Sequence, residues 1–380
     1  MGRFLDLENK FRCFREEIGA MLEFNFFKCW RAAPANKLRQ LADLVVLYTR
    51  HGFLPESYYN YRLYEPKIPL KQRVSAYVSD KDRYRQLGKV NTGYGDVLRN
   101  KWLFHTLYGA KNIPTPEYYG NFQHKRGSWQ DGSPLRSAPD IAAGCKAGRY
   151  PSFVAKPVFG SGGNRVLIFP EVSGGSRLQD SFGKTWTPEE LAEYIGARDY
   201  IFEAKVEQHP TLKALYPYSL NTVRIVTLFD GKEVVPWTAV LRAGTRASGA
   251  VDNWGRGGLS IAVEPSSGKM GKGVVSVKHL GDLPEFMAVH PDSGWPFTGE
   301  ILPNWEQVLA TAEKAAKVVP GLPYVAWDVA ITPEGCCIIE GNHRPDVNLL
   351  QVHGGLLRNE TCSRWWQEQF APLPSSGLPD

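Results

Sequence analysis

A lysine followed by a glycine-rich run stands near the middle of the chain, and these residue types suit the binding of phosphate. Lys156 ends an apolar run, and the loop after it contains Gly160, Ser161, Gly162 and Gly163. Backbone N–H groups in such a loop can surround phosphate oxygens, while the lysine adds a fixed positive charge. The glycines lead into a predicted strand at Arg165 rather than into a helix, which argues against a dinucleotide-binding fingerprint. A plain tight hairpin is the alternative.

Oxygen-bearing side chains gather in a predicted hairpin nearer the C-terminus. Two apolar runs flank a turn at Pro333–Gly335. We predict a three-residue loop whose glycine adopts the left-handed conformation. In that register Thr332 lies opposite Cys336, and Asp328 therefore lies opposite Glu340.

This hairpin predicts a metal site. Side chains alternate along a strand, so Asn342 shares a face with Glu340. Together with Asp328 they form a patch of hard oxygen donors that suits Mg²⁺ shared with substrate phosphates. A four-residue loop would instead point Asp328 away from Glu340, and a polar outer face of the hairpin is the alternative to a metal site. An unpaired carboxylate among apolar residues would be costly, which argues against that alternative.

Three arginines indicate recognition of an anion. Arg224 and Arg242 lie within apolar runs, and Arg256 lies in a glycine-rich run that begins at Asp252. A guanidinium group can hold a carboxylate or a phosphate through two parallel hydrogen bonds. We predict that the three arginines face an anionic acceptor and serve catalysis, with surface ion pairs as the alternative.

The predicted elements that position these residues are short strands after residue 150, with helices between them. The strands are expected over Ser152–Lys156, Arg165–Phe169, Tyr200–Val206, Val223–Phe229, Val234–Leu241, Leu259–Val263, Tyr324–Ile331 and Cys336–Glu340. Helices are expected over Val97–Gly109 and Trp305–Val319. A further helix starts after Thr187, with Pro188 at its first position and Glu190 at its third, as in a capping box.

Residues 1–60 are expected to be helical. Apolar residues recur at helical spacing, namely Leu38, Leu41, Leu44, Val45 and Tyr48. The pattern stops at His51 and Gly52, a usual helix end. The aromatic run Phe24–Trp30 is expected to pack in a core, with a membrane-surface or partner face as the alternative.

The charge of the chain is uneven. Its 380 residues carry a formal net charge of +6, but residues 62–126 hold 13 Lys/Arg and 5 Asp/Glu. A basic segment can serve nucleic acid, an anionic membrane or an anionic small molecule, and it can also be an ordinary solvated surface. No zinc-finger, homeodomain or RNP-type signature accompanies it, so nucleic acid is not expected as a partner.

The chain is expected to be cytoplasmic. Its six cysteines form no C-x-x-C pair, which favours free thiols in a reducing compartment. The stretch Met1–Arg12 lacks the apolar core of a secretory signal, and no apolar run approaches the length of a membrane span. At about 100–200 residues per domain, two or three domains are expected.

In combination these motifs resemble the ATP-grasp superfamily over about residues 96–355. The ordered set that carries the resemblance is Lys101 in Asn-Lys-Trp-Leu-Phe, Ile113–Pro116, Lys156 with its glycine loop, Glu203, Arg224, Asp328 and Glu340-Gly-Asn342. Three further strings look most like the sugar-transfer-associated branch: Glu207–Pro210, Asn221–Thr227 and Asp252–Gly258. Asn100 stands where many members have Asp.

The resemblance implies an α+β fold in which two lobes enclose a cleft for ATP, preceded by a mainly helical N-terminal region. It implies domains at 1–95, 96–203 and 204–370, and a flexible tail at 371–380. Lys101 and Lys156 would contact phosphates, and the loop Gly160–Gly163 would close over them. Glu203 and the backbone of Ala204, Lys205 and Val206 would hold adenine, Glu207 would bind ribose, and Asp328, Glu340 and Asn342 would hold Mg²⁺.

The implied activity is an ATP- and Mg²⁺-dependent ligase that joins a carboxylate to an amine or a thiol through an acyl-phosphate. Its acceptor would be a small-molecule carboxylate or a sugar-type compound, in polysaccharide or natural-product modification. A kinase that phosphorylates a hydroxyl is the alternative, with His209, His343 and Asp346 as candidate bases. A basic RNA- or membrane-binding module is an alternative of another class.

Overall fold

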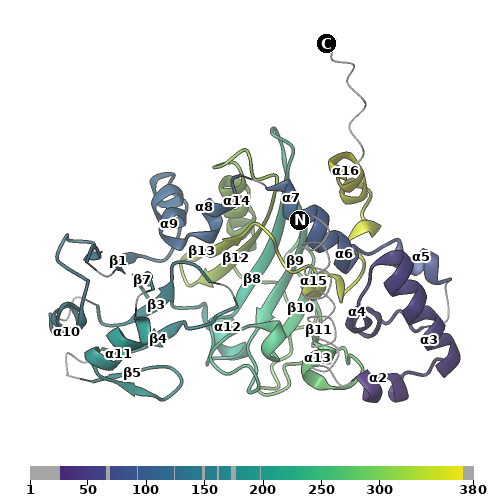
Figure 1. Ribbon diagram of the computed structural model, residues 1–380, viewed down its shortest axis with the longest axis horizontal. Coiled ribbons are helices and arrows are strands. Elements are labelled where there is room, and N and C mark those ends of the chain that lie inside the picture. Colours follow the sequence, from purple (N-terminus) through teal and green to yellow (C-terminus); the bar gives the residue numbers. More distant parts are fainter. Residues whose placement is uncertain are drawn as a thin grey trace, which may run out of the picture. The chain divides into compact units, whose positions relative to one another are not determined.

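A computed structural model describes residues 26–65, 69–91, 93–123, 125–147, 150–160, 162–172, 177–196 and 198–370. The described residues form two compact units, whose elements are labelled in Figure 1. Unit 1 takes its described residues from 1–90, 274–286 and 346–380, and unit 2 takes them from 91–273 and 287–345.

Unit 1 is built from helices. They are α2 Phe26–Ala32, α3 Lys37–Val46, η1 Leu47–His51, α4 Pro55–Asn60, α5 Leu70–Val74, α6 Asp80–Asp82, η2 Arg83–Leu87, α7 Gly88–Val90, α13 Val277–Leu280, α15 Asn348–Gln351, η4 Leu356–Arg358 and α16 Glu360–Phe370. Tyr58, Tyr59 and Phe53 are buried in its core. The helical N-terminal region is thus confirmed where it is described; residues 1–25 and the predicted tail 371–380 lie outside the described residues.

The ends of the first long helix follow local chemistry. The Asn36 side chain accepts hydrogen bonds from two N–H groups at the start of α3. The helical path ends at His51, where Gly52 turns to a left-handed φ of 70°, so the predicted stop is confirmed. The predicted core packing of the preceding aromatic run is only partly correct, because Trp30 packs against the core whereas Phe27 is 65% exposed.

One sheet of unit 2 is antiparallel and has the strand order β2-β1-β7-β3-β4. The strands are β1 Tyr118–Phe122, β2 Ser128–Trp129, β3 Phe153–Pro157, β4 Leu167–Phe169 and β7 Tyr200–Glu203. Helices α10 Ala138–Lys146 and α11 Pro188–Ile195 and the small pair β5 Leu178–Gln179 and β6 Thr185–Trp186 complete this part. The capping box predicted at Thr187 and Glu190 is confirmed. We keep the predicted domain boundary after residue 203 as a proposal, since this sheet ends there.

The second sheet of unit 2 has the order β11-β10-β9-β8-β12-β13. Its strands are β8 Thr222–Phe229, β9 Val234–Ala243, β10 Leu259–Val263, β11 Met270–Val275, β12 Tyr324–Thr332 and β13 Gly335–Asn342, accompanied by α12 Pro210–Leu215, η3 Trp254–Arg256 and α14 Trp305–Ala316. On one face, the Cys336 thiol lies 3.4 Å from Thr311 Oγ1 of α14. Ile331 pairs with Cys336, so Asp328, three residues away on the same strand, points to the opposite face.

The predicted hairpin register is wrong at the turn and right at the site. Thr332 pairs with Gly335 rather than with Cys336, so the loop has two residues. A register shift between Val329 and Asp328 then restores the pairing of Asp328 with Glu340. A β-bulge adds one residue to one strand, which compensates for the residue missing from the loop. The left-handed conformation expected at the turn glycine is not adopted, because a two-residue loop does not require it there.

The predicted helix Val97–Gly109 is two helices, α8 Asp96–Arg99 and α9 Lys101–Ala110. Asn100 breaks it by taking an extended conformation (φ −89°, ψ 103°). Its side chain accepts hydrogen bonds from the backbone N–H groups of Trp102 and Leu103, which favours a new helix start over continuation. The remaining predicted elements are present with ends shifted by a few residues. Within the described residues, no helix is both long and apolar enough to cross a bilayer.

Candidate functional site

The start of α9 is attached to the glycine loop through Lys101. Its backbone N–H donates to Val158 O at 3.1 Å, and its Nζ donates to Gly160 O at 2.9 Å. The Lys101 side chain is buried, and burial lowers its pKa. The neighbouring Lys156 ammonium lowers this pKa further, while Glu340 opposes the change. A buried ammonium next to a second one is an environment that an anionic ligand would stabilise.

The glycine loop adopts a conformation that its glycines permit. Gly162 and Gly163 have φ values of 67° and 69°, in the left-handed region. A Cβ at Gly163 would also lie 3.4 Å from Val251 Cγ1. The third predicted loop glycine, Gly160, has no positive φ, and Ser161 lies outside the described residues. Glycine is therefore needed at these two positions of the loop between β3 and β4, and the role of the loop as a phosphate cradle stays a prediction.

Lys156 belongs to a buried polar chain of three side chains. In β3 and β7, alternating residues face the apolar core, which leaves Lys156 and Glu203 together on the other face. The Lys156 ammonium is paired with one oxygen of the Glu203 carboxylate, and His105 Nε2 lies 2.8 Å from the other. Burial would raise the pKa of Glu203, but Lys156 and His105 together hold it below its ordinary value.

The contacts with Lys156 and His105 determine the role of the Glu203 side chain. Both of its carboxylate oxygens already have partners, so the side chain fixes Lys156 in place. His105 was not found from the sequence, although it follows Lys101 by four residues and therefore shares a face of α9 with it.

The predicted adenine segment directly follows β7. Ala204 N–H donates to Glu117 O at 2.8 Å, which fixes the path of the chain. Lys205 and Glu207 are exposed and Val206 is half-buried. Their proposed contacts with adenine and ribose remain predictions.

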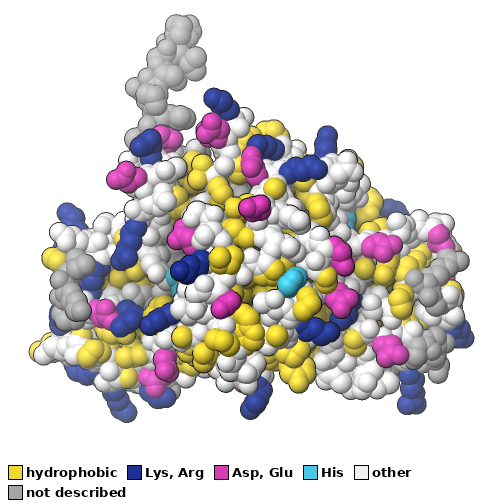
Figure 2. Space-filling model, turned by 180° about the vertical axis from the view of Figure 1, so that it is seen from behind, with side chains coloured by type: hydrophobic (Ala, Val, Ile, Leu, Met, Phe, Trp, Pro, Cys, Tyr) yellow, Lys and Arg dark blue, Asp and Glu magenta, His cyan; other side chains and the backbone are white. Residues whose placement is uncertain are grey.

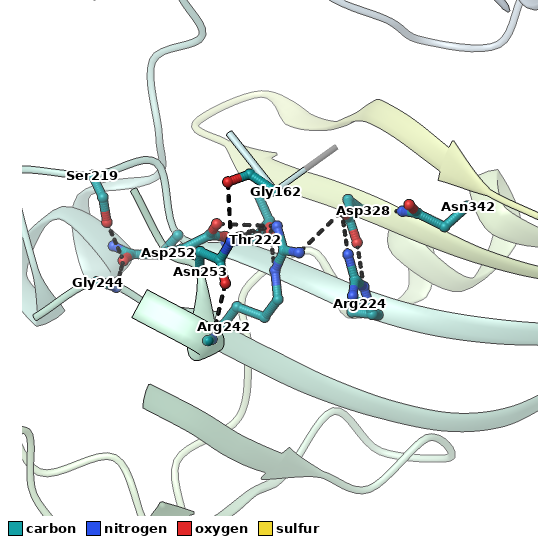
Figure 3. A network of polar contacts seen from close by, with 12 residues as sticks. Gly162, Ser219, Thr222, Arg224, Arg242, Gly244, Asp252, Asn253, Asp328 and Asn342 are labelled. Carbon is teal, nitrogen blue, oxygen red and sulfur yellow. Dashed lines mark hydrogen bonds and ion pairs between the residues drawn. The ribbon is translucent and has the colours of Figure 1, made fainter. Parts of the chain in front are cut away.

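A second polar network lies on the face of the other sheet that points away from α14, and Figure 3 shows it. Arg224 on β8 holds Asp328 on β12 through two hydrogen bonds, Nε–Oδ1 at 2.7 Å and Nη2–Oδ2 at 2.8 Å. Arg242 on β9 reaches Asp328 Oδ2 at 3.1 Å and Asp252 Oδ1 at 3.0 Å. Thr222 donates its hydroxyl to Asp252 at 2.5 Å.

The two arginines and two aspartates of this network balance in charge. Burial alone would raise the pKa of Asp328, but Arg224 and then Arg242 lower it from 3.8 to about 2. Burial raises the pKa of Asp252 despite its contact with Arg242. The Arg224 pKa is raised, since Asp328 outweighs the cost of burial. Asp252 begins the glycine-rich run that contains Arg256, but it was not predicted as a site residue.

The three predicted metal ligands, Asp328, Glu340 and Asn342, lie together. Only two of them are carboxylates, and the described residues contain no group of three or more His, Cys, Asp or Glu side chains that could hold a metal ion. Glu340 pairs with Asp328 across the hairpin, and Asn342 Nδ2 lies 3.3 Å from Asp328 Oδ2. Lys101 Nζ lies 3.9 Å from Glu340 Oε2. Two carboxylates and an amide oxygen are the donors that Mg²⁺ prefers, so the set fits this ion. Both Asp328 oxygens are engaged by arginines, and a direct metal contact there would displace Arg242 or Arg224.

The third predicted arginine is elsewhere. Arg256 ends η3 and donates a hydrogen bond to the Asn164 side chain, beside the glycine loop. The adjacent Asn253 Nδ2 donates to Gly162 O at 3.0 Å (Figure 3). The structure therefore brings Arg224 and Arg242 together and places Arg256 against the predicted phosphate loop.

No curated protein matches this chain. Solved structures similar to it include N5-carboxyaminoimidazole ribonucleotide synthetase from Thermotoga maritima (12% identity, TM-score 0.36, covering 67% of this chain and 44% of that one). They also include L-amino acid ligase from Bacillus licheniformis (12% identity, TM-score 0.36, covering 67% of this chain and 42% of that one). A third is biotin carboxylase from Campylobacter jejuni (12% identity, TM-score 0.40, covering 74% of this chain and 48% of that one). The chain spans less than half the length of each of these three structures.

A family match covers most of the chain. The sequence model of the family described as sugar-transfer associated ATP-grasp matches residues 83–362. The matched segment includes both polar networks, from Lys101 to Asn342. The chain therefore belongs to the sugar-transfer associated ATP-grasp family.

Proposed function

We propose that this protein is an ATP- and Mg²⁺-dependent ligase that joins a carboxylate to an amine or a thiol. The observation that carries the proposal is the pair of buried lysines at the glycine loop, Lys101 and Lys156, with the Glu340 carboxylate 3.9 Å from Lys101 Nζ. Cations and a carboxylate this close together suit a charged ligand that binds both, namely nucleotide phosphates with a metal ion. Membership of an ATP-grasp family supports the same ligand.

Bound ATP would supply the phosphoryl group, and Mg²⁺ would offset the charge of its phosphates. Lys101 and Lys156 would bind phosphate oxygens, and the N–H groups at Gly162 and Gly163 would close the loop over them. Glu340 and Asn342 would hold the metal ion, with Asp328 behind them.

The reaction would proceed in two displacements. An oxygen of the acceptor carboxylate would attack the terminal phosphorus, and the bond to ADP would break. An amine or a thiol would then attack the acyl carbon, and inorganic phosphate would leave. Arg242 would bind the acceptor carboxylate and would stabilise the negative charge that develops on the acyl oxygen during the second attack, since its guanidinium is planar and fully ionised.

The geometry gives less support to a kinase. Of the candidate bases for a hydroxyl acceptor, His209 Nδ1 accepts a hydrogen bond from Thr211 N–H at the start of α12. Asp346 is paired with Arg83 at 2.6 Å and also accepts from Asn348 N–H. These structural roles of His209 and Asp346 compete with proton transfer, which leaves His343 as the candidate base of a kinase. An acyl-phosphate route needs no base in its first step.

The experiment uses hydroxylamine to capture an acyl-phosphate. The protein is incubated with Mg²⁺–ATP, hydroxylamine and a pool of sugar acids and amino acids. A hydroxamate, ADP and free phosphate are expected. A stable phosphorylated product without hydroxamate or free phosphate would instead establish the kinase.

A nucleic-acid-binding module is the alternative of another class. Figure 2 shows basic and acidic side chains interspersed among the described residues of one face, rather than a basic stripe. A measurement of ATP turnover distinguishes the ligase from the binding module. RNA binding without any ATP turnover would contradict the ligase proposal.

A further inference from the structure

An apolar stripe lies exposed along α3, the helix at the right of Figure 1. The stripe consists of Leu38, Leu41 and Val45, which are 79%, 57% and 54% exposed. Leu44 on the same helix is only 9% exposed and belongs to the core of unit 1. The core side of α3 is therefore already occupied, and the α3 stripe is a separate second apolar surface.

The spacing makes the stripe continuous. Its three residues are separated by three and then four positions, so they are neighbours on one side of the helix. Ala42, on the same side, is exposed as well. Large apolar side chains placed in a row in water do not stabilise the unit, and such a surface indicates a binding partner.

The segment that carries the stripe has a net positive charge. Between residues 26 and 51 it has one acidic residue, Asp43, and five basic ones: Lys28, Arg31, Lys37, Arg39 and Arg50. The difference is a formal charge of +4, which becomes +3 when Asp282, the partner of Lys28 at 3.0 Å, is counted with the segment. Arg31 and Arg50 are exposed. Lys37 Nζ holds the carbonyl oxygens of Trp30 and Ala33 at 2.7 and 2.9 Å, which fixes α3 against the end of α2.

We propose that the α3 stripe binds the surface of an anionic lipid bilayer. A helix with one apolar side and basic residues around it lies in the plane of a membrane interface, with its apolar side chains below the headgroups. Leu38, Leu41 and Val45 would enter the acyl boundary, while Arg31 and Arg50 would meet anionic headgroups.

Charge favours the bilayer over a second copy of the chain. Two copies joined through this stripe would bring two surfaces together that each carry a formal charge of +3 with Asp282 counted, and like charges across an interface oppose association. An anionic surface complements the same segment. The proposal does not depend on the ligase activity, since none of these residues belongs to the candidate site.

The test measures binding of the full chain to vesicles by sedimentation. One set contains equal amounts of phosphatidylcholine and phosphatidylglycerol, and the other contains phosphatidylcholine alone. Binding is expected to the anionic set and to weaken as salt is added. The double variant Leu38→Gln/Val45→Gln should lower the partition coefficient about tenfold or more, because two apolar groups no longer enter the acyl boundary.

The matched control is Ile301→Gln, which changes an apolar residue that is 62% exposed in unit 2 and should leave binding unchanged. Thermal melting of each variant confirms that it folds, and Leu41→Gln serves as a milder second variant. Equal vesicle binding by wild type and the double variant would overturn the proposal. So would a wild-type dimer that the double variant converts to a monomer while neither binds vesicles, which would assign the stripe to a second copy.

Discussion

At the scale of single residues, Lys156 is held by Glu203, which is held in turn by His105. We expect Lys156→Ala to weaken ATP binding about tenfold or more, because a charge-assisted contact with phosphate is lost. Calorimetric titration measures the affinity. The control is Lys184→Ala, which removes an exposed lysine that lies over the Trp186 ring. Unchanged ATP affinity in Lys156→Ala would remove Lys156 from the site.

Variants of His105 test whether its contact with Glu203 helps to position Lys156. We expect His105→Ala to weaken ATP binding less than Lys156→Ala does, because Glu203 keeps one of its two partners. His105→Gln should restore most of the affinity, since its amide can still donate to the carboxylate. If both His105 variants bind ATP equally weakly, the hydrogen bond does not explain the effect.

Asp328 links the two arginines of the second polar network, so its contribution to stability can be tested. Asp328→Asn would leave the buried Arg224 without its carboxylate and Arg242 with Asp252 as its remaining carboxylate, which should cost about 3–5 kcal/mol of unfolding free energy at neutral pH. Urea denaturation measures the loss. Glu313→Gln removes an exposed partner of Lys317 and should cost less than about 1 kcal/mol. Similar losses in the two variants would contradict a buried, energetically important cluster.

The acid dependence follows from the same carboxylate. Its folded pKa is depressed from 3.8 to about 2, so its contribution to stability is present above 3.8 and is lost as the pH falls toward 2. Wild type should lose stability steeply across that window, and Asp328→Asn should lose less. Parallel pH profiles of the two proteins, measured by urea denaturation, would exclude Asp328 as the cause.

At the scale of elements, the break at Asn100 places Lys101 at the first position of α9. We expect Asn100→Ala to cost about 1 kcal/mol through loss of the cap, and also to weaken ATP binding because Lys101 loses its orientation. Asn36→Ala removes the equivalent cap of α3 and should cost similar stability without changing ATP affinity. Calorimetry and urea denaturation separate the two effects. Equal ATP affinity in both variants would show that the cap only stabilises the helix.

At the scale of the whole molecule, each unit has a core of its own, around Tyr58 and Tyr59 in unit 1 and around Phe153 and Phe202 in unit 2. We expect a nonhydrolysable ATP analogue with Mg²⁺ to stabilise unit 2, which carries every candidate ligand. At a concentration of about 100 times Kd, the gain is about 2.7 kcal/mol. Hydrogen exchange under native conditions measures it for each unit. An equal gain in protection from exchange at α3 and at β12 when the analogue is added would contradict binding to unit 2 alone.

Much of the local structure was determined by the sequence itself. The capping box at Thr187, the stop at Gly52 and strand β10 are where the sequence predicts them. These features depend on interactions between residues a few positions apart, so spacing and residue type are enough. The conformation of the glycine loop is also determined locally, since only residues without a Cβ readily adopt the φ values of Gly162 and Gly163.

The hairpin shows how a correct pairing can follow from an incorrect turn. The sequence does not reveal that a shorter loop and a bulge cancel, because both depend on how β12 also pairs with β8. The pairing of Asp328 with Glu340 was predicted, whereas the ion pairs of Asp328 with Arg224 and Arg242 were not. Arg224 lies 104 positions before Asp328, and only the ladder between β8 and β12 brings them together.

Tertiary structure also decided which side of α3 is buried. Periodicity identifies residues that share a side of a helix, and both Leu44 and the α3 stripe fit a helical pattern. It does not tell which side meets the core, because that depends on the surface against which the helix packs. Leu44 is buried and Leu38 is 79% exposed, an outcome set by contacts with α2 and α4 rather than by the hydrophobicity of either residue.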